Sequence, residues 1–125
     1  MKDIISKNAP APIGPYSQAI VAGNLLFVSG QVAINPVNGE LVTQDIQAET
    51  TQVMENIKAI LIEAGTDFNR IVKTTIFLKT MDDFAAVNTV YGSYLSQPFP
   101  ARETVAVAGL PKNVNVEISV TVLLG

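Results

Sequence analysis

The chain has 125 residues, a length that suits a single domain over residues 1–125 with one hydrophobic core. Its net charge of −3, with scattered Lys and Arg, argues against binding to nucleic acid, and the absence of Cys and His excludes disulfides, thiolate chemistry and the commonest general base and metal ligand. Charged residues make up 15% of the chain against a typical share of about 25%, which indicates either a large core or a surface covered by copies of the same chain.

The N-terminal part begins with a short predicted strand at residues 2–6 and shows no targeting signal. The segment MKDIISKNAP lacks the apolar core of a signal peptide, and no apolar run approaches the roughly 18 residues of a membrane span. We therefore expect a cytoplasmic protein that does not enter a membrane. Three prolines and a glycine within residues 8–16 predict a loop.

A β-hairpin is predicted next. Two apolar runs, 17–22 and 25–29, flank Gly23-Asn24, and a Gly-Asn pair between such runs is typical of a tight turn. We expect Gly30 to end the second strand.

The clearest helix signal covers residues 45–64. Asp45 is placed to cap its N-terminus, and Gly65 suits the position just after its C-terminus. Apolar residues at spacings of three and four form one stripe, which predicts the buried face. The stripe consists of Ile46, Val53, Met54, Ile57, Ile60, Leu61 and Ala64.

The second half of the chain predicts a strand, a helix and two strands. Residues 71–79 are rich in β-branched residues and favour a strand. A helix is expected from Asp82 or Asp83, as its cap, to about Leu95. Residues 103–108 and 114–123 are interpreted as a final strand pair, because apolar and polar residues alternate strictly in the second of them.

The resulting order, β-β-β-α-β-α-β-β, predicts an α+β fold with two helices on one face of a sheet. Two charged residues stand out in it. Arg102 enters a strand after a proline-containing turn, where a planar guanidinium suits a carboxylate ligand, although a plain surface charge fits equally well. Glu117 lies in the middle of the last predicted strand, at one of the polar positions that alternate with apolar ones. It therefore either faces solvent or lies in a partly dry pocket, where its carboxyl could exchange protons with water.

Several stretches together resemble the Rid (YjgF) family and its RidA branch of reactive-intermediate deaminases. In chain order they are NAPAPIGPYSQAI, LLFVSGQVAINPVNGE, NIKAILIEAG, IVKTTIFLK with DDFAAVN, FPAR and LPKNVNVEI. The resemblance implies a chorismate-mutase-like fold and a homotrimer with clefts between subunits. It also implies hydrolysis of 2-imino acids, or of the enamines that tautomerise to them, to 2-keto acids and ammonium, without a cofactor or metal.

Carried over by position, the resemblance implies that Arg102 pairs with the substrate carboxylate and that Glu117 orients or activates water. It further implies that Tyr16 lies over the ligand and that the Thr104 backbone meets the imino nitrogen. The other residues implied to line or adjoin the cleft are Ser29, Gly30 and Asn88.

One departure from the family pattern follows the arginine, where Glu103-Thr104 replaces the frequent Ser-Cys. Strand alternation predicts that Glu103 points away from the face of Arg102 and Thr104, so that it does not compete with the substrate. A direct Glu103–Arg102 ion pair would contradict the site.

Two other functions remain open at this point. The same pocket could bind 2-keto acids or other small carboxylates as a sensor, without turnover. A nuclease or translation-inhibiting role is also associated with the family, but the lack of a basic patch and of His argues against it.

Overall fold

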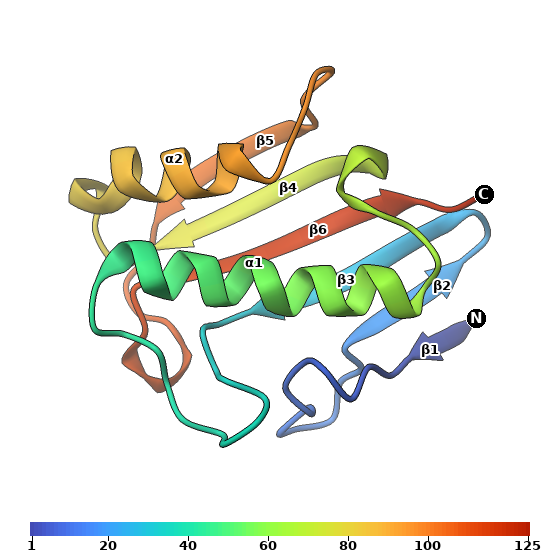
Figure 1. Cartoon of the computed structure of the whole chain (residues 1–125), viewed down its shortest axis with the longest axis horizontal. Helices are drawn as coiled ribbons and strands as arrows, with labels where there is room; N and C mark the ends of the chain where they lie inside the picture. The colour runs from blue at the N-terminus through green and yellow to red at the C-terminus, as the bar shows by residue number, and fades with distance from the viewer.

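A computed structural model describes all 125 residues and shows a mixed six-stranded sheet with two helices on one face (Figure 1). This confirms the predicted α+β class and element order. The strands are β1 (Lys2–Ile4), β2 (Ala19–Ala22), β3 (Leu25–Gln31), β4 (Ile71–Leu78), β5 (Ala101–Ala106) and β6 (Val116–Leu123), and the helices are α1 (Ile46–Glu63) and α2 (Phe84–Ser93).

The strand order is β1-β2-β3-β6-β4-β5, so the predicted pairing of the last two strands with each other is wrong. Strand β4 lies between them, antiparallel to β6 and parallel to β5. The connection explains the arrangement, because α2 carries the chain from β4 back over the sheet and a helical crossover joins parallel strands. Strand β5, which carries Arg102, is therefore an edge strand.

Helix α1 forms as predicted. The Asp45 side chain accepts a hydrogen bond from the Ala48 amide at 2.6 Å, and Gly65 adopts a φ of +77° just past the helix end. One polar residue on its buried side, Glu49, is completely buried and holds the start of β6. Its carboxylate accepts hydrogen bonds from the backbone amides of Asn115 (2.7 Å) and Val116 (3.2 Å) and from the Asn115 side chain (2.7 Å).

One predicted boundary and one predicted capping interaction are wrong. Gly30 does not end β3, which continues to Gln31 through a register shift opposite β6. Asp83 occupies the N-cap position of α2 as predicted but makes no side-chain capping bond, because a short 3-10 turn, Met81–Asp83, precedes the helix and Thr80 caps that turn instead. The helix ends at Ser93, close to the predicted end near Leu95.

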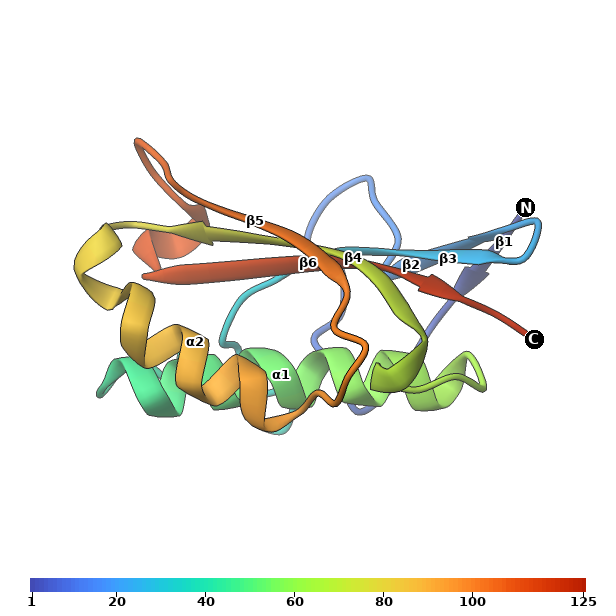
Figure 2. The same ribbon diagram turned by 90° about the horizontal axis from the view of Figure 1, so that it is seen from above.

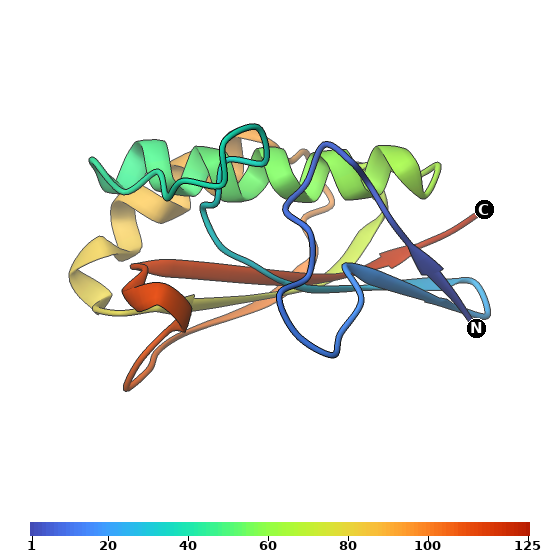
Figure 3. The ribbon, with the colours of Figure 1, turned by 90° about the horizontal axis from the view of Figure 1, so that it is seen from below.

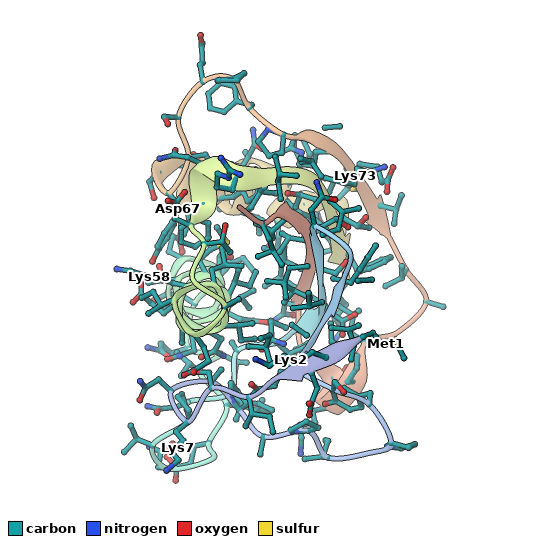
Figure 4. All side chains as sticks on the ribbon, turned by 90° about the vertical axis from the view of Figure 1, so that its right-hand side faces the viewer. Met1, Lys2, Lys7, Lys58, Asp67 and Lys73 are labelled. Carbon is teal, nitrogen blue, oxygen red and sulfur yellow. The ribbon has the colours of Figure 1, made fainter.

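The core lies between the two α-helices and the sheet, and the opposite face of the sheet carries no α-helix (Figures 2 and 3). In β6 the residues that face the helices are buried, whereas Glu117, Ser119 and Thr121 alternate with them on the open face. Phe27 pairs with Thr121 on that face and is 46% exposed. Figure 4 shows Lys58 on the helix side and Lys73 on the open side of the molecule. None of the helices is sufficiently long and apolar to cross a membrane.

Candidate functional site

Arg102 lies on the helix-side face of the edge strand β5 and is held by α2. Its guanidinium donates a hydrogen bond to the side-chain oxygen of Asn88. It also lies over two aromatic rings, 5.3 Å from the centre of the Tyr91 ring and 5.7 Å from that of Phe84. These contacts restrict the side chain of Arg102 while leaving it exposed, so it is neither free in solvent nor neutralised by a carboxylate.

The orientation of the Tyr91 ring is itself determined by a buried hydrogen bond. The Tyr91 hydroxyl contacts the hydroxyl of Thr74 at 2.9 Å, and Thr74 is fully buried directly beside Arg102 in the β4–β5 register. Burial raises the pKa of Tyr91, and the Thr74 hydrogen bond and the charge of Arg102 oppose that rise. Sequence reasoning missed Tyr91, because a tyrosine on the apolar stripe of a helix is typical of a core residue.

A cavity of about 450 Å³ adjoins the guanidinium. Asn88 and Arg102 supply its polar groups, and the rest of its wall comes from the end of α2 and the loop that follows it. These remaining residues are Tyr91, Gly92, Leu95, Phe99 and Pro100. A cation beside an apolar wall suits a small acid whose carboxylate meets the cation and whose side chain meets the wall.

Glu117 lies on the open face, in the middle of the sheet, and lines a second cavity of about 400 Å³. Burial raises the pKa of its carboxyl above the ordinary value, and no Lys or Arg lies within ion-pair distance of it. A carboxyl with a raised pKa can accept and return a proton near neutral pH more readily than an exposed one. Tyr16, Ser29 and Gly30 line the same cavity.

The loop that carries Tyr16 is ordered by Gln18. The buried Gln18 side chain accepts a hydrogen bond from the Ser6 amide at 2.7 Å and donates one to the Pro10 carbonyl at 2.9 Å. Ser29 donates its hydroxyl proton to the carbonyl of Ser17. The proline-rich loop therefore projects on the open side of the sheet (Figure 3), with Tyr16 half-exposed at the edge of the cavity.

The predicted site residues thus form two groups on opposite faces of the sheet. The helix-side group contains Arg102, Asn88 and Thr104, and the open-face group contains Glu117 with Tyr16, Ser29 and Gly30. The Thr104 side chain lies on the Arg102 face by strand alternation, and its buried hydroxyl has no hydrogen-bond partner. Within one chain the structure does not bring the two groups together.

Glu103 points to the open face, as the alternation predicts. Its carboxylate forms an ion pair with Lys73 at 3.2 Å and accepts a hydrogen bond from Thr75 at 2.9 Å. The Thr75 hydrogen bond and Lys73 lower the pKa of Glu103. Arg102 is consequently free of an internal carboxylate partner. No group of three or more carboxylates lies close enough to hold a metal ion.

Comparison with known proteins gives consistent matches over nearly the whole chain. Residues 6–124 match the family described as endoribonuclease L-PSP. The RutC family protein PH0854 of Pyrococcus horikoshii is 55% identical over 119 residues, which cover 94% of each chain. The 2-iminobutanoate/2-iminopropanoate deaminase of Escherichia coli K12 is 47% identical over 120 residues, which cover 94% of this chain and 93% of the relative.

The fold also matches solved structures. The crystal structure of Escherichia coli TdcF with bound serine superposes with a TM-score of 0.95 at 37% identity and covers 100% of both chains. A relative with this backbone therefore accommodates serine, an amino acid whose α-carbon carries both a carboxylate and an amino group.

Proposed function

The chain belongs to the endoribonuclease L-PSP (YjgF/Rid) family, and on this premise we propose that it hydrolyses small 2-imino acids, such as 2-iminobutanoate and 2-iminopropanoate, to 2-keto acids and ammonium. The observation that carries the proposal is the state of Arg102. Its guanidinium is oriented by Asn88 and two aromatic rings and has no internal carboxylate partner, so it is prepared for the carboxylate of a ligand.

We further propose that the working site forms between copies of the chain in a homotrimer. Arg102 and Glu117 lie on opposite faces of one sheet, so one chain cannot present both to a small molecule. The open face also exposes Phe27 and Val105, 46% and 42% exposed, which are apolar side chains suited to burial against another copy. A cleft in which the Arg102 group of one subunit meets the Glu117 group of its neighbour would supply both.

The reaction in such a cleft needs no covalent catalyst. The protonated imine R–C(=NH₂⁺)–COO⁻ reacts with water to give R–CO–COO⁻ and NH₄⁺. The Glu117 carboxylate would take one proton from the attacking water and deliver it to the nitrogen of the carbinolamine. The C–N bond then breaks as the carbinolamine hydroxyl gives its proton to Glu117 and becomes the ketone, and Glu117 passes this second proton to the departing ammonia, which leaves as NH₄⁺. Arg102 would hold the carboxylate throughout, and the Thr104 backbone would face the nitrogen. Positioning and one proton carrier suffice, because the iminium carbon is already electrophilic.

Binding without turnover is the second candidate function. The serine-bound TdcF structure favours it, since that relative holds a small amino acid at 37% identity. A 2-keto acid would present the same carboxylate to Arg102. Binding of 2-oxobutanoate with no acceleration of imine decay would support this sensor function and contradict the enzyme.

A ribonuclease, the activity named in the family description, has less support in the site. Glu117 is the single carboxylate in its cavity, and Arg102 and Lys112 are the only cations that line the two cavities of the proposed cleft. Phosphate cleavage needs an acid–base pair and a basic surface that tracks the nucleic acid backbone. RNA cleavage by repurified protein that disappears in Arg102→Ala would reverse this conclusion.

The direct test measures the decay of 2-iminobutanoate generated in situ. We expect the wild-type chain to accelerate the decay and Arg102→Ala to lose most of the effect, about 2–4 kcal/mol for a charge-assisted contact, or roughly 30- to 1,000-fold. Glu117→Gln should lower kcat while binding of 2-oxobutanoate stays intact. Wild-type decay at the uncatalysed rate would refute the function.

A mixing experiment tests the intersubunit cleft separately. Arg102→Ala and Glu117→Gln chains are each expected to be inactive, and when they are unfolded together and refolded in equal amounts, about a quarter of the clefts in random trimers combine an intact Arg102 with an intact Glu117. Activity should then recover to about a quarter of the wild-type value. No recovery in mixed trimers, verified by mass, would show that both residues act within one chain or not at all.

A further inference from the structure

Gly30 differs from the other glycines of the chain in what occupies the space beside it. A Cβ atom built on Gly30 would lie 2.7 Å from both the carboxyl carbon and Oε2 of Glu117, and 3.0 Å from its Cγ. At every other glycine such an atom meets nothing closer than 3.6 Å. The Glu117 carboxyl therefore fills the volume that any other residue at position 30 would occupy with its own side chain.

The backbone does not require glycine at this position. Four glycines of the chain have a positive φ, namely Gly23, Gly39, Gly65 and Gly125, and Gly30 is not among them. Gly30 lies at the register shift of β3 against β6, between the pairs Val28–Val120 and Gln31–Ile118, in a conformation open to alanine. The need for glycine comes from the neighbouring strand.

We infer that Gly30 is a positioning residue for the carboxyl of Glu117. This carboxyl can pack against the β3 backbone because position 30 has no side chain. This inference rests on the proposed function for its catalytic consequence, but its structural content does not. Packing against the backbone of β3 confines the carboxyl oxygens and removes water from one side of them. Gly30 thereby acts through Glu117, in addition to lining the cavity.

The same packing explains the protonation behaviour of Glu117. Burial raises the pKa of Glu117, and no hydrogen bond or charge from a neighbouring group counts among the causes of this shift. Tyr16 and Lys112 are the other titratable groups that line the cavity, and Phe77, directly opposite on β4, carries no charge. Displacing the carboxyl from β3 toward solvent should lower its pKa toward the ordinary value.

The test is Gly30→Ala, with Gly109→Ala as the matched control, because a Cβ on Gly109 meets nothing within 4 Å and its φ is not positive. We expect Gly30→Ala to lower kcat by about 10- to 100-fold with KM within about twofold of the wild type, since a displacement near 1 Å has effects of that size. In a Glu117→Gln background the same substitution should cause no further loss. Multiplicative losses in the double variant would overturn the inference.

Two measurements are independent of activity. The pKa of the Glu117 carboxyl, followed by ¹³C NMR and assigned with Glu117→Gln, should fall in Gly30→Ala and stay constant in Gly109→Ala. Any loss of thermal stability in Gly30→Ala should disappear when Glu117→Ala is added. An unchanged pKa, or a stability loss that persists without the Glu117 side chain, would overturn the inference even if the wild type hydrolyses imines. If the wild type does not hydrolyse them, these two results still decide the positioning.

Discussion

The aromatic support of Arg102 can be separated experimentally into a stability effect and a binding effect. Tyr91→Phe keeps the ring under the guanidinium but leaves the fully buried Thr74 hydroxyl without its 2.9 Å partner. An unsatisfied buried hydroxyl costs about 1–3 kcal/mol, so we expect a fall in Tm of roughly 3–10 °C. Binding of 2-oxobutanoate, measured by titration calorimetry, should change by less than about twofold.

Tyr91→Leu removes the ring itself, which lies 5.3 Å from the guanidinium carbon. A cation–π contact is worth about 0.5–2 kcal/mol, so the dissociation constant for 2-oxobutanoate should rise roughly two- to thirtyfold. The double variant Tyr91→Phe with Thr74→Val removes both hydroxyls at nearly constant shape and should recover most of the stability lost in Tyr91→Phe. Equal binding by Tyr91→Leu and the wild type would refute the supporting role, and no recovery in the double variant would refute the hydrogen bond as the source of stability.

Three further predictions concern carboxylates. Burial raises the folded-state pKa of Glu117, so the contribution of this carboxyl to stability is present at low pH and is lost as the pH rises through that pKa. The unfolding free energy of Glu117→Gln, measured by chemical denaturation, should therefore rise relative to that of the wild type between pH 4 and 8. A difference between the two unfolding free energies that stays constant with pH would contradict this prediction. Glu49→Ala should lose about 3 kcal/mol or more of unfolding free energy, because the buried backbone amides at the start of β6 would lose their hydrogen-bond acceptor. Glu49→Gln should lose less, since its amide oxygen can still accept a hydrogen bond. Equal losses in the two variants would be inconsistent with hydrogen bonding as the cause. Glu103→Ala should bind 2-oxobutanoate as the wild type does, because Glu103 pairs with Lys73 on the face opposite Arg102, and tighter binding would reveal competition for Arg102.

The fold was predictable where local patterns and tertiary packing agree. Helix α1 has a capping aspartate, an apolar stripe and a terminal glycine, and all three appear in the structure. Strand β6 alternates strictly and is buried on alternate residues as expected. The order of the strands was not predictable in this way. Whether β5 pairs with β6 or β4 depends on the path of α2 over the sheet, which no local pattern encodes.

The site shows the same division. Alternation along β5 correctly separated Arg102 and Thr104 from Glu103, because neighbouring residues in a strand point to opposite faces. Further roles of two other residues could not be predicted from the sequence, for physical reasons. Tyr91 has the spacing of a core residue and is indeed buried, but the face of its ring serves Arg102. The pattern around Gly30 predicts the end of a strand, and nothing in it indicates that the side chain of Glu117 occupies the volume beside this glycine.

The separation of Arg102 and Glu117 by a sheet has a chemical consequence for the proposed cleft. A guanidinium in contact with Glu117 within one chain would favour the ionised carboxylate, lower its pKa and occupy the donors that a substrate needs. The sheet prevents that contact, so Arg102 remains available while burial keeps the pKa of Glu117 raised. In the proposed trimer the two groups would meet across a space that the substrate fills, with the ligand carboxylate taking the cation. Within one chain, the opposing requirements of a free cation and a weakly acidic carboxyl are therefore satisfied by strand geometry.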